Sequence, residues 1–116
     1  MAITEAFANT QTVTTTEHDL PSDTTTVGAQ ASAGVYQVFL DLNTLADADV
    51  FRFKAYEKVG SGSTQRVFFS QDISNAQGTE DNWVSPSFIL LNGWTFTLTK
   101  IAGTDRVIDW SIRKVA

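Results

Sequence analysis

The chain has 116 residues, no cysteine and a formal net charge of −5. This length suits one domain with a single hydrophobic core, and the absence of cysteine excludes disulfide bonds and thiolate metal sites. The pI of about 4.5 argues against nucleic-acid binding, which requires a basic surface. No apolar run reaches the roughly 20 residues that span a bilayer, and no signal peptide is recognisable. We expect a soluble, unexported protein whose partners include neither nucleic acid nor membrane.

Charge is distributed unevenly along the chain. Residues 1–51 contain seven acidic residues and no Lys or Arg, whereas residues 52–116 contain all eight basic residues and six acidic ones. A solvated acidic surface is the simplest explanation, because Asp and Glu are common in turns. The alternative that bears on function is an acidic N-terminal half that docks on a basic protein surface.

The first segment, residues 1–33, is polar and rich in threonine, and its apolar residues are isolated. We expect an extended N-terminal arm with one strand near residues 10–20, because Thr and Val favour extended backbone and Pro21 cannot continue a ladder. Such a segment has too little apolar surface to order alone. It should therefore become ordered only against the body of the protein or a partner.

Residues 34–116 are predicted to form a β-sandwich body, because apolar and polar residues alternate along successive runs. In one of these runs, Phe51, Phe53 and Ala55 fall on the inward face, and the flexible loop at residues 60–64 leads to a return strand. The expected strands of the body are residues 34–42, 50–59, 65–71, 83–91, 94–100 and 106–112.

The clearest alternation lies in residues 94–112, where two apolar runs flank a break near Gly103. The apolar positions are Trp94, Phe96, Leu98, Ile108, Trp110 and Ile112. We expect the two runs to form a β-hairpin in which Gly103 supplies the positive φ. Asn92-Gly93 predicts a further hairpin that pairs residues 87–91 with residues 94–100. The sequence thus predicts an all-β fold, an antiparallel, jelly-roll-like β-sandwich of about seven strands with hairpins in its second half.

Residues that could support catalysis or bind a metal are few. His18 is the only histidine, and a Ser-His dyad would depend on it within the expected arm. The acidic loop at residues 41–49 lacks the spacing of a calcium-binding loop, so we expect its aspartates to cap turns. The glycine-containing loop at residues 60–64 lacks the lysine and helix of a phosphate-binding loop. We predict no enzyme activity, no catalytic or metal-binding residues and no cofactor.

The three tryptophans raise the question of carbohydrate binding, because aromatic side chains can form platforms for sugars. Trp94 and Trp110 are in phase with the apolar face and are expected to be buried. Trp83 adjoins the polar stretch at residues 72–82 and is therefore the candidate for contact with a sugar.

Four segments carry a resemblance to a known group of proteins, namely ANTQTVTTTEHDL, GVYQVFLDLNTLADADVFRFKAYEKV, GSGSTQRV and LLNGWTFTLTKIAGTDRVIDWSIRK. Through them the chain resembles small β-sandwich structural proteins in the virions of tailed bacteriophages. The resemblance implies a capsid decoration or cement protein that binds and stabilises the shell of major capsid protein. It implies assembly in the host cytoplasm and a final place on the capsid surface, and it assigns no functional residues.

A cement protein has to bridge capsid subunits, and an extended arm can do so by adding a strand to a neighbour. The expected interface residues are the apolar anchors Ile3, Phe7 and Val13 and the acidic residues Glu5, Glu17 and Asp19, which would meet basic residues of the shell. A homo-oligomer, a dimer or a trimer, would suit the symmetry of a shell. A tail or neck component and a carbohydrate-binding module at a tail tip are the alternatives.

Overall fold

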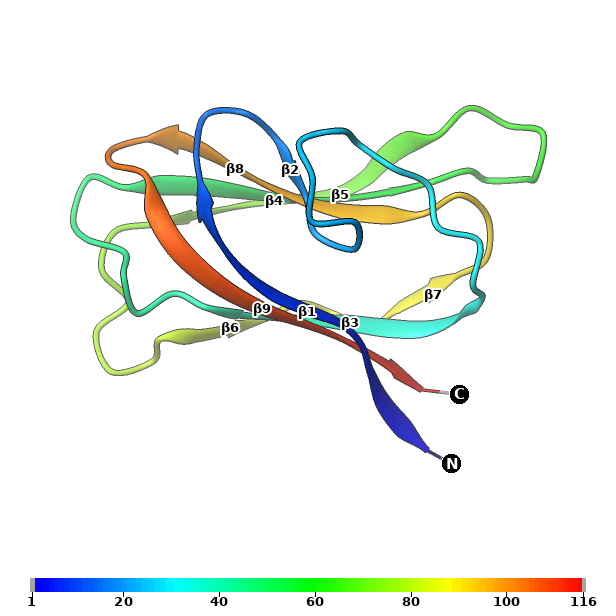
Figure 1. Cartoon of the computed structure of the whole chain (residues 1–116), viewed down its shortest axis with the longest axis horizontal. Coiled ribbons are helices and arrows are strands. Elements are labelled where there is room, and N and C mark those ends of the chain that lie inside the picture. The colour runs from blue at the N-terminus through cyan, green and yellow to red at the C-terminus, as the bar shows by residue number, and fades with distance from the viewer. Residues whose placement is uncertain (1, 116) are drawn as a thin grey trace.

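Two antiparallel β-sheets packed face to face account for the fold (Figure 1). The computed structural model describes residues 2–115, so Met1 and Ala116 of the expected segments 1–33 and 34–116 lie outside it. The described residues contain no helix, and hence none that is long and apolar enough to cross a bilayer. Their strands are β1 (Ile3–Val13), β2 (His18–Asp19), β3 (Gly34–Asp41), β4 (Val50–Glu57), β5 (Arg66–Ser74), β6 (Asn82–Val84), β7 (Phe88–Leu90), β8 (Thr95–Ala102) and β9 (Arg106–Val115).

The five-stranded sheet has the order β1-β9-β3-β6, and β7 pairs with another part of β3. The four-stranded sheet has the order β2-β8-β4-β5. Every strand pairing is antiparallel. The expected all-β antiparallel sandwich is therefore confirmed. Nine strands replace the expected seven, because the N-terminal segment forms two strands and the strand expected at residues 83–91 is divided.

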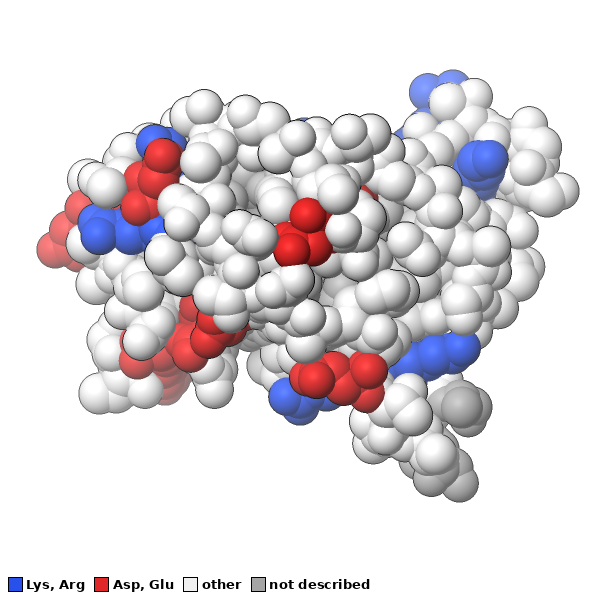
Figure 2. Space-filling view, viewed as in Figure 1, with Lys and Arg blue, Asp and Glu red and all other residues white. Residues whose placement is uncertain are grey.

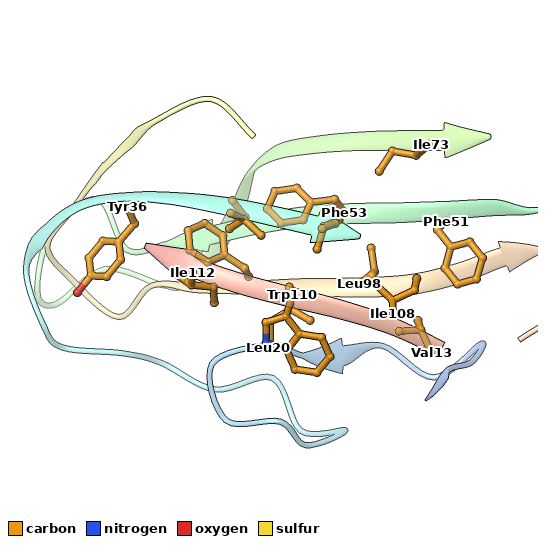
Figure 3. Packing of buried hydrophobic residues seen from close by; sticks show 14 of the residues in the cluster. Val13, Leu20, Tyr36, Phe51, Phe53, Ile73, Leu98, Ile108, Trp110 and Ile112 are labelled. Atoms are coloured by element: carbon orange, nitrogen blue, oxygen red, sulfur yellow. The ribbon is translucent and has the colours of Figure 1, made fainter. Parts of the chain in front are cut away.

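The hydrophobic core lies between the two sheets (Figure 3). In β4, Phe51, Phe53 and Ala55 are all 0% exposed, as their alternation predicted. Trp94 and Trp110 are also buried, at 0% and 3% exposed, as expected. Alternation therefore identified the inward face of these strands correctly, because successive side chains of a strand point to opposite faces.

The expected hairpin between residues 94–100 and 106–112 is wrong. β8 pairs with β2 and β4, whereas β9 pairs with β1 and β3, so the two strands belong to opposite sheets. Each strand has one apolar face, and their placement in opposite sheets lets the two faces cover each other. Gly103 still turns the chain with a φ of 90°, but the turn joins two layers.

Pro86 divides the strand expected at residues 83–91 into β6 and β7, both of which pair with β3. Proline has no amide hydrogen for the ladder, which explains the interruption. Ser85 attaches the interrupted segment to β3. Its amide donates to the carbonyl oxygen of Val38 at 2.9 Å, and the amide of Val38 donates to its hydroxyl at 2.9 Å.

The second hairpin prediction, at Asn92-Gly93, is also wrong. Gly93 has a positive φ of 52°, as a tight turn requires, but β7 and β8 lie in different sheets. Among the described residues, the hairpin that remains is β4–β5, which pairs across the loop expected at residues 60–64. A turn signal specifies the local bend and not the sheet that the next strand joins.

The N-terminal segment is part of the sandwich and not a separate arm. β1 pairs with β9 along its whole length, and β2 joins the other sheet beside β8. Val13 and Leu20 are 0% and 1% exposed and belong to the core. The strand expected at residues 10–20 thus begins at Ile3 and ends at Val13. An edge strand buries few side chains, so β1 lacks the apolar alternation that would have revealed its bounds.

We predict that Gly103→Ala destabilises the fold much more than Gly78→Ala. Both glycines have positive φ, 90° and 69°, so either substitution should cost about 1–2 kcal/mol of backbone strain. A Cβ at Gly103 would also lie 2.7 Å from the Cα of Asp49, whereas a Cβ at Gly78 meets nothing within 4 Å. Urea unfolding should therefore show an additional loss of at least about 1 kcal/mol for Gly103→Ala. Equal losses would contradict the close packing of Gly103.

Candidate interaction surface

The described residues offer no metal site and no catalytic cluster around the histidine. No group of three or more His, Asp or Glu side chains among residues 2–115 could hold a metal ion. His18 is 8% exposed, its Nε2 lies 2.8 Å from the carboxylate of Asp23, and its ring meets Trp110 edge-on at 5.6 Å. The local partners of His18 are thus an acid and an aromatic ring, and no nucleophile is among them.

Two of the three aspartates in the loop at residues 41–49, Asp41 and Asp49, cap turns as predicted. Asp41 accepts the amide hydrogen two residues ahead at 3.2 Å. Asp49 is buried and accepts the amides of Ala46 and Thr104 at 2.9 and 3.0 Å and the Nε of Arg106 at 2.7 Å. These donors lower the pKa of Asp49 to about 2. Its carboxylate is therefore committed to holding this loop against the start of β9.

Three of the expected interface residues lie in the first half of β1. Ile3 is 68% exposed and Glu5 is also exposed, and both lie on the outer face of the five-stranded sheet, opposite Val115 and Arg113. A bulge between Glu5 and Phe7 reverses the alternation. Phe7 consequently points inward, where its ring meets that of Trp94 at 6.3 Å. Ile3 and Glu5 are thus exposed to a partner, with Glu5 also accepting the hydroxyl of Ser111 at 2.5 Å, while Phe7 packs against the protein's own core.

Val13 and Glu17 make internal contacts, unlike the partner contacts predicted for them. Val13 is 0% exposed in the core. One carboxylate oxygen of Glu17 accepts the hydroxyl of Tyr56 at 2.5 Å and the hydroxyl of Thr97 at 2.6 Å. Thr97 lies on the same face of β8 as Thr95 and Thr99. This polar face of β8 therefore binds Glu17, which follows β1 in the chain.

Asp19 is 0% exposed, so the expectation that it meets basic residues of a shell is wrong. Its carboxylate accepts the amide of Ser22 at 3.2 Å and its hydroxyl at 2.5 Å, the amide of Gly28 at 3.1 Å, and the hydroxyl of Thr95. Several donors offset the cost of burying a charge. Asp19 therefore organises the segment at residues 19–28 against β8.

The tryptophans do not form an exposed platform. Trp94 and Trp110 are buried, and Trp83 is half-buried and packs against the core, with its ring centroid 5.1 Å from that of Phe53. The indole of Trp83 points inward because Trp83 pairs with Leu40, an inward residue of β3. The residue expected to contact a sugar is thus a core residue at the sheet edge.

The first surface that remains for a partner is the open edge of β1. β1 is the last strand of its sheet and has β9 as its neighbour on one side. Near its second half, the side chains of Asn9 and Gln11 donate to Asp23 at 2.6 and 3.2 Å, so the loop after β2 lies beside this part of the edge. The first half projects from the body together with the end of β9 (Figure 1). Backbone amides and carbonyls along Ile3–Ala8 are therefore open to strand addition.

The second surface is the outer face of the five-stranded sheet, where strand register forms an apolar row. The pairs Ile3–Val115, Val115–Val35 and Val35–Ile89 place four aliphatic side chains side by side on β1, β9, β3 and β7. Ile3 and Ile89 are 68% and 85% exposed. Beside this row, a hollow of about 150 Å³ is lined by Phe39 and other residues of the sheet. Exposed apolar side chains gathered in this way mark interaction sites.

The opposite end of the outer face is acidic. Asp41 and Asp109 are directly paired on β3 and β9 and line a hollow of about 180 Å³. Glu80 and Asp81 line the adjoining hollow. Figure 2 shows acidic side chains gathered near the position of β6. The outer face therefore changes from apolar to acidic along the strand direction.

Neither surface can be recognised from one continuous stretch of the sequence. The apolar row combines residues from four strands that are far apart in the chain, so it becomes visible only when their register is known. The outward apolar residues Val35 and Phe39 of β3 and Val107 and Val115 of β9 do break the alternation of apolar and polar residues in these strands. Such doubly apolar strands could have indicated a second packed or docked face.

Comparisons with known proteins establish the fold alone. No protein-family model matches the chain, and no relative was found among curated proteins. The mitogen from Yersinia pseudotuberculosis is similar in structure, with a TM-score of 0.53 and 10% identity over 99% of this chain and 86% of that chain. A chain from the disulfide-linked pili of Bacillus endospore appendages has a TM-score of 0.46 and 17% identity over 97% and 88%. Neither is a phage capsid protein.

We predict that Glu17→Gln lowers the pKa of Tyr56. Burial and the hydrogen bond to Glu17 raise this pKa to about 12, from about 10 in an unfolded chain. The neutral phenol therefore stabilises the fold below pH 10, and this contribution is lost as the pH rises towards 12. Titration of the Tyr56 ring by NMR should show a lower pKa in Glu17→Gln and no change in Glu5→Gln. An unchanged pKa in Glu17→Gln would contradict the contact.

Proposed function

We propose that this chain is a non-enzymatic structural protein of a tailed-phage virion that decorates the capsid and stabilises the shell of major capsid protein. The resemblance in sequence supports the virion, and the open edge of β1 is the observation that supports binding to another protein. The sandwich is a rigid carrier, because its core is shared by both sheets. Its role is to hold this edge in a fixed geometry against the shell, on the capsid surface.

Strand addition explains how the edge would bind. β1 contains no Lys or Pro, two of the features that commonly protect edge strands from pairing, although it carries one bulge, between Glu5 and Phe7. An extended segment of the shell protein would form main-chain hydrogen bonds with Ile3–Ala8, and alternate side chains would supply specificity. Ile3 and Glu5 are exposed at this position, so they would contact the shell with an apolar group and a negative charge.

The two alternatives are a tail or neck component and a carbohydrate-binding module, and the structure supports them unequally. A tail or neck component would use the same fold and the same edge, and its copy number in the particle would differ. A carbohydrate-binding module would need an exposed aromatic platform, and all three tryptophans pack into or against the core. The capsid surface is therefore the location that we propose.

The first test is the copy number of the protein in purified particles of the phage that encodes it, measured by quantitative mass spectrometry. We expect a number comparable with that of the major capsid protein. A handful of copies would indicate the tail or neck instead, and absence from the particles would contradict a virion protein of any kind.

The matched test of the edge is deletion of residues 2–5, which are all exposed and of which residues 3–5 pair with the end of β9. The deletion removes no buried side chain, so circular dichroism should be unchanged while occupancy on the shell falls. Val59→Ser is the control, because Val59 is 97% exposed and lies in the loop after β4. Full occupancy after the deletion would contradict binding through the edge.

A further inference from the structure

Asn92 and Gly93 form the tight turn that carries the chain from β7 to β8. Of the five asparagines in the sequence, Asn92 alone is followed by glycine. The peptide nitrogen that follows an asparagine can attack its side-chain carboxamide, which makes asparagine one of the thermolabile residues of proteins. Glycine has no Cβ and so does not hinder this attack. The sequence therefore makes Asn92 the most reactive asparagine of the chain.

Neither reacting group of this turn is held by a hydrogen bond. Among the described residues, none donates to or accepts from the side chain of Asn92 or the amide nitrogen of Gly93. Within the same residues, the buried side-chain polar atom that lacks a partner is Nε1 of Trp110. The carboxamide of Asn92 is thus unpartnered but not shut off from water. The nucleophilic nitrogen, the carboxamide and water can therefore meet at this turn.

The other asparagines are either hydrogen-bonded or followed by a bulkier residue. The Nδ2 of Asn9 donates to a carboxylate at 2.6 Å and its Oδ1 accepts a backbone amide at 2.8 Å. The Oδ1 of Asn75 likewise accepts a backbone amide at 3.0 Å. Asn43 and Asn82 are followed by threonine and tryptophan, whose side chains hinder attack by the peptide nitrogen. Asn92 is thus distinguished by its contacts as well as by its neighbour in the chain.

We propose that Asn92 is a site of spontaneous deamidation, with water as the co-reactant. The nitrogen of Gly93 loses its proton to the solvent and bonds to Cγ of Asn92, while the bond from Cγ to Nδ2 breaks and ammonia leaves. Water then opens the resulting succinimide ring. Cleavage of the new bond at Cγ gives aspartate, whereas cleavage at the main-chain carbonyl carbon gives isoaspartate. In sum, one water is consumed and one ammonia is released, and nothing is oxidised or reduced.

Both products would disturb the entry into β8. Oε2 of Glu57 accepts the backbone amides of Leu91 and Asn92 at 2.6 and 3.0 Å, so a new carboxylate at residue 92 would repel the one that holds this turn. Isoaspartate also lengthens the main chain directly before Trp94. Trp94 is 0% exposed and exchanges two backbone hydrogen bonds with Gln30, at 2.7 and 3.1 Å. Deamidation should therefore lower the temperature at which the protein unfolds.

The reaction is separate from the proposed function, because it needs no partner and no shell. The test is prolonged incubation of the purified full chain at mildly alkaline pH, followed by peptide mapping with mass spectrometry. We expect Asn92 to become a mixture of aspartate and isoaspartate, with an equal amount of ammonia released, before the other asparagines react. Conversion should accelerate as the pH rises, because the attacking nitrogen must lose its proton. An intact Asn92, or equal conversion at all asparagines, would overturn the proposal.

Asn92→Gln is the blocking variant, and Asn82→Gln is its matched control. Glutamine would have to form a larger ring, which closes more slowly. Neither Asn92 nor Asn82 makes a side-chain hydrogen bond within the described chain, so both variants should fold. Ammonia release should fall in Asn92→Gln and continue in Asn82→Gln, and incubation should lower the unfolding temperature of the wild type and of Asn82→Gln alone. Release from a folded Asn92→Gln at the wild-type rate would overturn the proposal.

Discussion

The structure depends on the antiparallel pairing of β9 with β1 on one side and β3 on the other. This pairing places Ile108, Trp110 and Ile112 towards the four-stranded sheet, where all three are buried. It also brings the first and last strands of the chain together, so the N-terminal segment becomes part of the sheet. Everything presented to a partner on the five-stranded sheet follows from this register, because it decides which side chains face outward.

The acidic N-terminal half acts partly on the protein itself. Glu17 and Asp19 bind the hydroxyls of Thr97 and Thr95 on β8, and Asp49 binds Arg106 at the start of β9. These carboxylates fix the N-terminal segment and the loops to β8 and to the start of β9. Of the other acidic residues in this half, Glu5 and Asp23 also accept internal hydrogen bonds, and Asp41 lies on the outer face, paired with Asp109 of β9. The acidic residues of the N-terminal half thus mainly accept hydrogen bonds within the protein, and Asp41 contributes to the acidic end of the outer face.

The inward faces of strands could be predicted from sequence, but their sheet partners could not. Alternation alone identified Phe51, Phe53, Trp94 and Trp110 as buried, since the period of two is a local property of extended backbone. The tight turns at Gly93 and Gly103 were also recognised, and both glycines have positive φ. Whether the chain after each turn pairs with the preceding strand or crosses to the other layer depends on long-range packing, which local turn chemistry does not determine.

The expected interface residues differ in whether the fold leaves them exposed. Ile3 and Glu5 are exposed, and Glu5 also accepts the hydroxyl of Ser111, whereas Asp19 lies in a cluster of donors drawn from residues 22–28 and Thr95. Those donors are brought to Asp19 by a turn and by a strand from the far end of the chain. The apolar row of the outer face was missed because its members belong to four different strands, and the sequence does not reveal the register that brings them together.

Amide hydrogen exchange along β1, followed by NMR, is the most direct measurement of whether the N-terminal segment belongs to the sheet. In an edge strand, amides that point to β9 are hydrogen-bonded, whereas the intervening amides point away from it. We expect slow and fast exchange to alternate along Ile3–Val13, with one interruption at the bulge between Glu5 and Phe7. Uniformly fast exchange over these residues would show a mobile arm and would contradict the pairing on which the fold and the proposed strand addition depend.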